Sequence, residues 1–197
     1  MKKMRNPKEK WGSFVARWFL YFFCYSVIGW CYEVFLEVVV YRWGFSNRGF
    51  LLGPYCPVYG FGALIFLACL SGLKHRRMEW KLPLQAADGR RIAINVTPVV
   101  VFFGIAVIAT VIELVASYLM EWVTGGWMWD YRRFAFNFQG RIALNPSLRF
   151  GLGGMVFLYG IQPLLEKVTD RLGDKAVRMT ALVLFCVMVV DLIGKVL

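Results

Sequence analysis

The sequence predicts an all-α integral membrane protein with about five transmembrane helices. Of its 197 residues, 59% are hydrophobic and only 18% are charged, whereas soluble domains contain roughly 45–50% apolar residues. The apolar residues gather in long runs, and the stretches between these runs are rich in Lys and Arg. A run of about 20 apolar residues, coiled as a helix, spans the ~30 Å hydrocarbon core of a bilayer.

We expect a single transmembrane domain over residues 1–197, with spans at residues 18–41, 56–73, 96–122, 148–165 and 179–196. The first run is longer than the roughly 7–15 apolar residues of a signal peptide and contains two acids, so it is interpreted as a retained helix. Pro98 stands in the first turn of the third span, where proline is tolerated. The glycines of the fourth span favour close helix packing.

The charge of the chain is strongly positive, with a formal net charge of +11. Its basic residues lie between the apolar runs, which is typical of membrane proteins and does not favour nucleic-acid binding. The N-terminal segment and residues 74–95 are the most basic parts. The positive-inside rule therefore places the N-terminus, residues 74–95 and residues 166–178 in the cytoplasm, and the loops 42–57 and 124–147 outside.

Several kinds of active site lack their residues in this sequence. His75 is the only histidine, and the five cysteines show no paired spacing, so neither a metal site nor a disulfide framework is expected. A phosphate-binding glycine-rich loop with Lys and Ser or Thr is also missing. We therefore expect no cofactor, and any ATP dependence requires a separate ATPase.

The two outer loops are unusual in composition. Residues 42–57 combine prolines, glycines and apolar residues, which predicts a rigid and partly buried loop rather than a soluble connection. Residues 124–147 contain Trp127, Trp129 and Tyr131, which we interpret as aromatic anchors at the membrane interface. Both loops are expected to be structured, and whether they re-enter the bilayer is left open.

Acidic residues occur inside the predicted spans. Glu33 and Glu37 share one helical face, Glu113 and Glu121 share another, and Asp191 lies in the last span. An ionised residue at the membrane centre costs roughly 2.5–3.5 kcal/mol on insertion scales, so these acids should face the helix bundle and be paired. The loop residues Arg48 and Arg141 match carboxylates with two donors each, which makes them the natural partners.

Two interpretations of this pattern stay open. The ion pairs either pin the loops to the helices or line a polar cavity that opens to the outside and binds a ligand. Catalytic residues are not assigned. The candidate ligand or cavity residues are Glu33, Glu37, Asn47, Arg48, Tyr59, Glu113, Glu121, Asp130, Asn137 and Arg141.

The sequence also contains a faint internal repeat. A helix with carboxylates is followed by a loop with Asn and Arg, a proline and a glycine-rich span, first around residues 33–62 and again around residues 113–153. This pattern predicts two parallel helix–loop–helix repeats followed by a C-terminal helix. Coincidence is the alternative, because the spacings differ between the copies.

Four blocks of sequence resemble a known family. They are Gly29-Trp30-x-x-Glu33, Asn47-Arg48-Gly49-Phe50, Trp129-Asp130-Tyr131 and Gly140-Arg141-Ile142. Over about residues 18–165 the chain resembles the bacterial ABC-transporter type IV permeases (CmpB-like). The resemblance implies a multi-pass protein of the bacterial inner membrane with a permease-like role, and it supplies no catalytic residues.

The leading hypothesis is a permease that moves a small solute or lipid, with a separate ATPase docking at residues 74–95. Its alternatives are a membrane enzyme acting on a lipid-linked or envelope substrate at the outer face, and a non-catalytic scaffold. In the enzyme, Glu33, Glu113 and Asp130 would act as acids or bases, and Arg48 and Arg141 would clamp an anion. A proton-coupled carrier would use the same acids as a relay.

Overall fold

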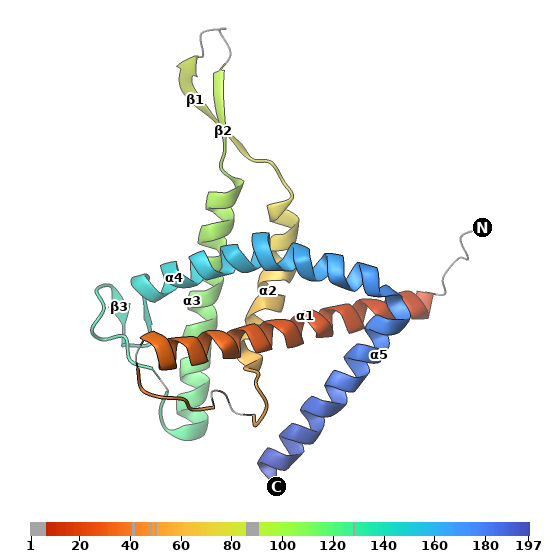
Figure 1. Cartoon of the computed structure of the whole chain (residues 1–197). Coiled ribbons are helices and arrows are strands. Elements are labelled where there is room, and N and C mark those ends of the chain that lie inside the picture. The colour runs from red at the N-terminus through yellow and green to blue at the C-terminus, as the bar shows by residue number, and fades with distance from the viewer. Residues whose placement is uncertain (1–6, 41, 48, 50, 86–90, 128) are drawn as a thin grey trace, which may run out of the picture. The chain divides into compact units, whose positions relative to one another are not determined.

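The computed structural model describes residues 7–40, 42–47, 49, 51–85, 91–127 and 129–197 and is mainly helical (Figure 1). Its helices are α1 (Pro7–Phe35), α2 (Pro57–Lys74), α3 (Thr97–Thr124), α4 (Leu144–Met155) and α5 (Gln162–Val196). Two π-helical segments, η1 (Leu36–Val40) and η2 (Val156–Ile161), continue α1 and α4. The predicted helical class is therefore confirmed.

Two short antiparallel hairpins accompany the helices, and the sequence had given no indication of them. One pairs β1 (Glu79–Gln85) with β2 (Arg91–Asn95), and the other pairs β3 (Asn137–Phe138) with β4 (Ile142–Ala143). The first hairpin lies within the basic connection 74–95, and the second lies within the loop 124–147. The described parts of both connections therefore contain paired strands.

Within the described residues, four helical segments are long and apolar enough to cross a membrane: Trp11–Val40, Pro57–Lys74, Thr97–Val123 and Leu144–Lys195. The first three correspond to the predicted spans 18–41, 56–73 and 96–122. The first helix begins earlier than predicted, because Pro7 suits the first helical position and the charged residues after it are good helix formers. The protein is accordingly a multi-pass membrane protein.

The fourth segment joins the predicted spans 148–165 and 179–196. Residues 166–178 were expected to form a charged connection, but they are helical except at Gly173 (φ 72°, ψ 160°). Apolar residues recur among the charges at helical spacing, which explains why this stretch coils. Gly173 adopts a conformation that is essentially restricted to glycine, so the chain changes direction at this residue.

The chain forms two compact units, and the first consists of Met1–Leu64 with Gln162–Leu197. In this unit α1 packs against α5, and Ala16 and Leu20 share a buried cluster with Val177 and Ala181. Before Gly173, α5 runs antiparallel to α1, and after it the helix turns back from the N-terminal end of α1 (Figure 1). Helix α1 therefore contacts both parts of the bent helix α5.

The second unit is Ile65–Ile161, and its main contact is between α3 and α4. Val101 and Ile105 of α3 are completely buried. Gly151 of α4 lies against the Phe102 ring and Gly154 lies against Ile105, so a larger side chain at either glycine would collide with α3. The glycines of the fourth span thus serve close packing at Gly151 and Gly154, whereas Gly153 and Gly160 face open space.

We expect Gly173→Ala to lower the free energy of unfolding by about 1–3 kcal/mol, because alanine is strained in this backbone conformation. Chemical unfolding in detergent micelles, followed by circular dichroism, would measure the loss. Gly194→Ala is the matched control, since Gly194 is helical and has open space around it. Equal stability of the two variants would contradict a glycine-dependent turn.

Candidate functional site

The acids of the first unit hold the loop that follows η1. Glu37 of η1 is buried, with 6% of its surface exposed, and accepts hydrogen bonds from Ser46 N (3.3 Å) and Ser46 Oγ (2.7 Å). Trp30 of α1 donates from Nε1 to Asn47 Oδ1 (2.8 Å), and the Asn47 amide donates to the carbonyl of Leu52 (2.7 Å). Glu37 and Asn47 thus position the loop.

Glu33 lies on α1 and accepts a hydrogen bond from the Tyr59 hydroxyl of α2. The Tyr59 ring packs directly over Gly29, where any side chain would collide with it. A close approach of α1 and α2 therefore brings Glu33 and Tyr59 together. The expected partner Arg48 lies outside the described residues, so its pairing with Glu33 or Glu37 stays a prediction.

Asp191 of α5 fixes the other end of this loop. Its two carboxylate oxygens accept from Leu52 N (3.1 Å), Gly53 N (3.0 Å) and the Tyr55 hydroxyl. Tyr55 is buried, and this burial, together with the hydrogen bond to Asp191, raises the pKa of its phenol above the ordinary range. The phenol therefore remains a proton donor to Asp191 at neutral pH.

The second unit contains a buried arginine that contacts an acid, a hydroxyl and two aromatic rings, although its Nε has no hydrogen-bond partner among the described residues. Arg141 is only 5% exposed and contacts Glu121 Oε2 through Nη2 (2.5 Å) and Ser117 Oγ through Nη1 (3.4 Å). Its guanidinium carbon lies 4.1 Å from the Tyr118 ring centre and 3.9 Å from the Trp127 ring centre. The expected pairing of Arg141 with an intramembrane acid is therefore present, and the acid is Glu121 of the third span.

The aromatic residues of the second loop contact the protein's own polar groups. Trp127 lies against Arg141, Trp129 donates from Nε1 to the Arg141 carbonyl (2.8 Å), and Tyr131 donates to Glu113 Oε1 (2.8 Å). Their interpretation as interfacial anchors stays a prediction. The contacts with Arg141 and Glu113 show that these rings hold the loop against α3.

Glu113 differs from the other acids of the second unit. Tyr131 satisfies Oε1, but Oε2 is buried and has no hydrogen-bond partner in the part of the chain that the structure describes. Two turns further along α3, Glu121 pairs with Arg141, which lies just before β4. Glu113 therefore keeps an open position, whereas the guanidinium of Arg141 is already occupied by Glu121, Ser117 and two rings.

Asp130 and Asn137 order the second loop from within. Asp130 is exposed, and its Oδ1 accepts from Arg132 N (2.9 Å). Asn137 accepts from Gly140 N (3.2 Å) and donates to the Phe134 carbonyl (2.8 Å). These bonds stay inside the loop, so both residues are placed at the surface of the second unit and apart from the Glu113 carboxylate.

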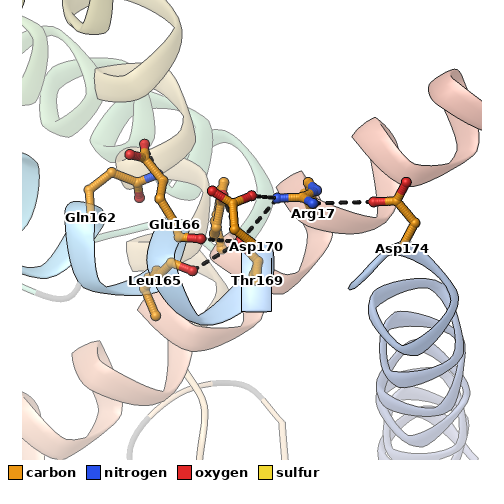
Figure 2. A network of polar contacts seen from close by, with 8 residues as sticks. Arg17, Gln162, Leu165, Glu166, Thr169, Asp170 and Asp174 are labelled. Carbon is orange, nitrogen blue, oxygen red and sulfur yellow. Dashed lines mark hydrogen bonds and ion pairs between the residues drawn. The ribbon is translucent and has the colours of Figure 1, made fainter. Parts of the chain in front are cut away.

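A row of polar contacts between α1 and α5, called the polar seam below, was not predicted from the sequence (Figure 2). Arg17 forms ion pairs with Asp170 and with Asp174 (3.2 Å). Tyr21 lies 3.2 Å from the Thr169 hydroxyl. One helical turn further along α1, Tyr25 donates to Gln162 Oε1 (2.9 Å), and Gln162 donates to Glu166 (3.0 Å).

The Arg17 contacts straddle the turn in α5. Asp170 precedes Gly173 and Asp174 follows it, so one guanidinium links both sides of the break. In the sequence, Arg17 is one of the basic residues of the N-terminal segment, which the positive-inside rule places in the cytoplasm. The signal that could have revealed the seam is the spacing of Arg17, Tyr21 and Tyr25, which puts all three on one helical face.

We expect Arg17→Ala to lower the free energy of unfolding by about 1–2 kcal/mol, because it removes both ion pairs across the turn. One of these pairs involves Asp174, which is half-buried, so its loss costs more than that of an exposed pair. Chemical unfolding in micelles measures the change. The control is Arg171→Ala, since Arg171 is an exposed residue of α5. A loss no greater than that of the control would show that the seam does not stabilise the bent helix.

We expect Arg141→Lys to cost about 2 kcal/mol although the charge is retained, because lysine cannot stack flat between two rings or present a forked pair of donors. Thermal unfolding monitored by tryptophan fluorescence measures this cost. Arg149→Lys serves as control, since Arg149 of α4 is exposed. Equal melting temperatures for Arg141→Lys and the unmutated protein would contradict the role given to stacking.

Comparison with known proteins gives one match. Searches of curated proteins and of solved structures return no match. The model of one family, described as "Putative ABC-transporter type IV", matches residues 20–196, which is most of the chain. This range includes the loops 42–57 and 124–147 and the acids Glu33, Glu37, Glu113, Glu121 and Asp191. The chain therefore belongs to this ABC-transporter-related family of membrane proteins.

Proposed function

We propose that this protein is a permease-like membrane protein that moves a small solute or lipid, driven by a separate ATPase. The observation that carries the proposal is Glu113, an intramembrane carboxyl group with one oxygen that no described protein group satisfies. A transport pathway needs a polar group that can exchange partners, and an intramembrane carboxyl group with an open oxygen meets this need. Membership of an ABC-transporter family supports the same function.

The topology proposed for this permease has five crossings. The turn at Gly173 divides the segment Leu144–Lys195 into two parts, and each part would cross the bilayer once. The charge distribution supports an N-terminus in the cytoplasm of a bacterium, with the loops 42–57 and 124–147 on the outer side. Glu33, Glu37, Asn47 and Tyr59 would then support one outer loop, and Arg48 is proposed to join them.

The enzyme hypothesis receives less support from the described geometry. Asp130, which was expected to act as an acid or base, is engaged by its own loop. Arg141, which was expected to clamp an anion, is stacked between two rings and paired with Glu121. Glu113 is the candidate acid with a buried open oxygen, and a single carboxyl group favours binding or relay over a complete catalytic set.

The hairpin β1–β2 is the proposed docking element for the ATPase. Trp80 and Ile94 stand directly opposite each other in its register and are 64% and 51% exposed. An isolated two-stranded hairpin is marginally stable in water, so a large exposed apolar pair favours a covering partner. The flanking basic residues Arg76, Arg77 and Lys81 would complement an acidic surface on that ATPase.

We expect the protein, extracted from native bacterial membranes in mild detergent, to co-purify with an ATPase whose ATP hydrolysis is vanadate-sensitive. The double variant Trp80→Ala/Ile94→Ala should lose most of that ATPase, because it removes the apolar pair. Trp43→Ala is the control, since Trp43 is as accessible as Trp80 (72% exposed) but lies in the loop 42–57, which is predicted on the outer side of the membrane. Absence of any ATPase, or its retention by the double variant, would contradict docking at the hairpin.

A further inference from the structure

Glu113 sits in an apolar stretch of α3, and its environment is asymmetric. Oε1 accepts one hydrogen bond from Tyr131, and Oε2 is buried without a donor in the described residues. Nearby hydroxyls are already used: Thr110 lies 2.6 Å from Ser147, and both hydroxyls also contact main-chain carbonyls. The carboxyl group is therefore half satisfied.

No described cation neutralises this carboxylate. From the second loop, the titratable group facing Glu113 is the Tyr131 phenol, which donates to it. Arg141, beside β4, is committed to Glu121, and Arg132 contacts Asp130 at the loop surface (3.9 Å). Arg149, the charged residue of α4, is exposed. Glu113 differs in this respect from Glu121, whose charge is balanced by Arg141.

Burial of a carboxylate with one donor and no counter-ion disfavours its ionised form, and a hydrogen bond from a phenol favours that form. These opposing effects make both protonation states accessible at Glu113. A proton on Oε2 removes the charge from the apolar region. A divalent metal is a poorer occupant, because it needs several oxygen ligands, and the described residues contain no group of three candidate ligands.

We propose that Glu113 is a proton-binding site, which takes up a proton on its open oxygen and releases it with the help of Tyr131. This inference rests on the proposed permease function and deepens it, since proton exchange at Glu113 would accompany movement of the solute. Tyr131 is a positioning residue in this arrangement: its hydroxyl holds Oε1 and stabilises the ionised form. Glu113 itself carries the proton.

Carbodiimide labelling tests this proposal in the full-length protein in lipid nanodiscs. Dicyclohexylcarbodiimide adds to protonated carboxyl groups in apolar surroundings and leaves ionised ones unmodified, and peptide mass spectrometry locates the adduct. We expect labelling of Glu113 at acidic pH and its loss as the pH rises, because only the protonated carboxyl group reacts. Glu113→Gln should abolish this adduct, and Glu33→Gln, on the first helix, should leave it unchanged.

Tyr131→Phe provides the sharper test, because a merely structural role would not predict the direction of its effect. Removal of the phenol donor should raise the pH at which labelling is lost by about one to two units. If this variant fails to fold, the infrared carboxyl band present in the unmutated protein and missing from Glu113→Gln should disappear on the same rise in pH. No adduct at Glu113, labelling independent of pH, or a midpoint lowered by Tyr131→Phe would overturn the proposal.

Failure of this proposal and failure of the permease function give different results. Labelling is measured on the purified protein, without ATPase or solute, so it depends on Glu113 alone. If labelling of Glu113 depends on pH but no ATPase partner is found in native membranes, the proton site is supported and the ATPase-driven permease is rejected. An ATPase partner with an unreactive Glu113 would reject the proton site and leave the permease intact.

Discussion

Carboxylates inside apolar helices must find their hydrogen bonds within the protein, because lipid offers no donors. In both units, this requirement determines where the loops lie. Asp191 draws the main chain of Leu52 and Gly53 and the Tyr55 phenol onto α5, and Glu37 holds Ser46. A loop that satisfies an acid of an apolar helix is thereby fixed to that helix, since its departure would leave an unpaired charge in a medium of low dielectric constant.

The second unit meets the same requirement with an arginine. Arg141 brings Glu121, Ser117 and two aromatic rings into one buried cluster, and Trp129 binds its carbonyl. Each unit also pairs a tyrosine with a glutamate, Tyr59 with Glu33 and Tyr131 with Glu113. The tyrosines occupy different places, one in α2 and one within a loop, so the predicted repeat stays a prediction.

The sequence predicted what depends on composition and helical spacing. Long apolar runs located the helices, and the cost of charge in lipid indicated that Arg141 would pair with an intramembrane acid. It missed the ion pairs of Arg17, which lies in a basic N-terminal segment. The partners Asp170 and Asp174 lie more than 150 positions away in the sequence. Pro83 made a strand improbable for residues 79–85, and yet a hairpin with a bulge forms there. The stacking of Trp127 on Arg141 is a tertiary contact without a local signal.

A cryo-EM structure of the protein in lipid nanodiscs, at a resolution that shows ordered waters, tests the central claim most directly. That claim is that the acids of the spans are satisfied by their own loops, with Glu113 left open. We expect Asp191 on the main chain of Leu52 and Gly53, Arg141 on Glu121, and density for a water or small ligand at Glu113 Oε2. A dry Glu113 paired with an arginine, or loops detached from Asp191 and Glu121, would contradict it.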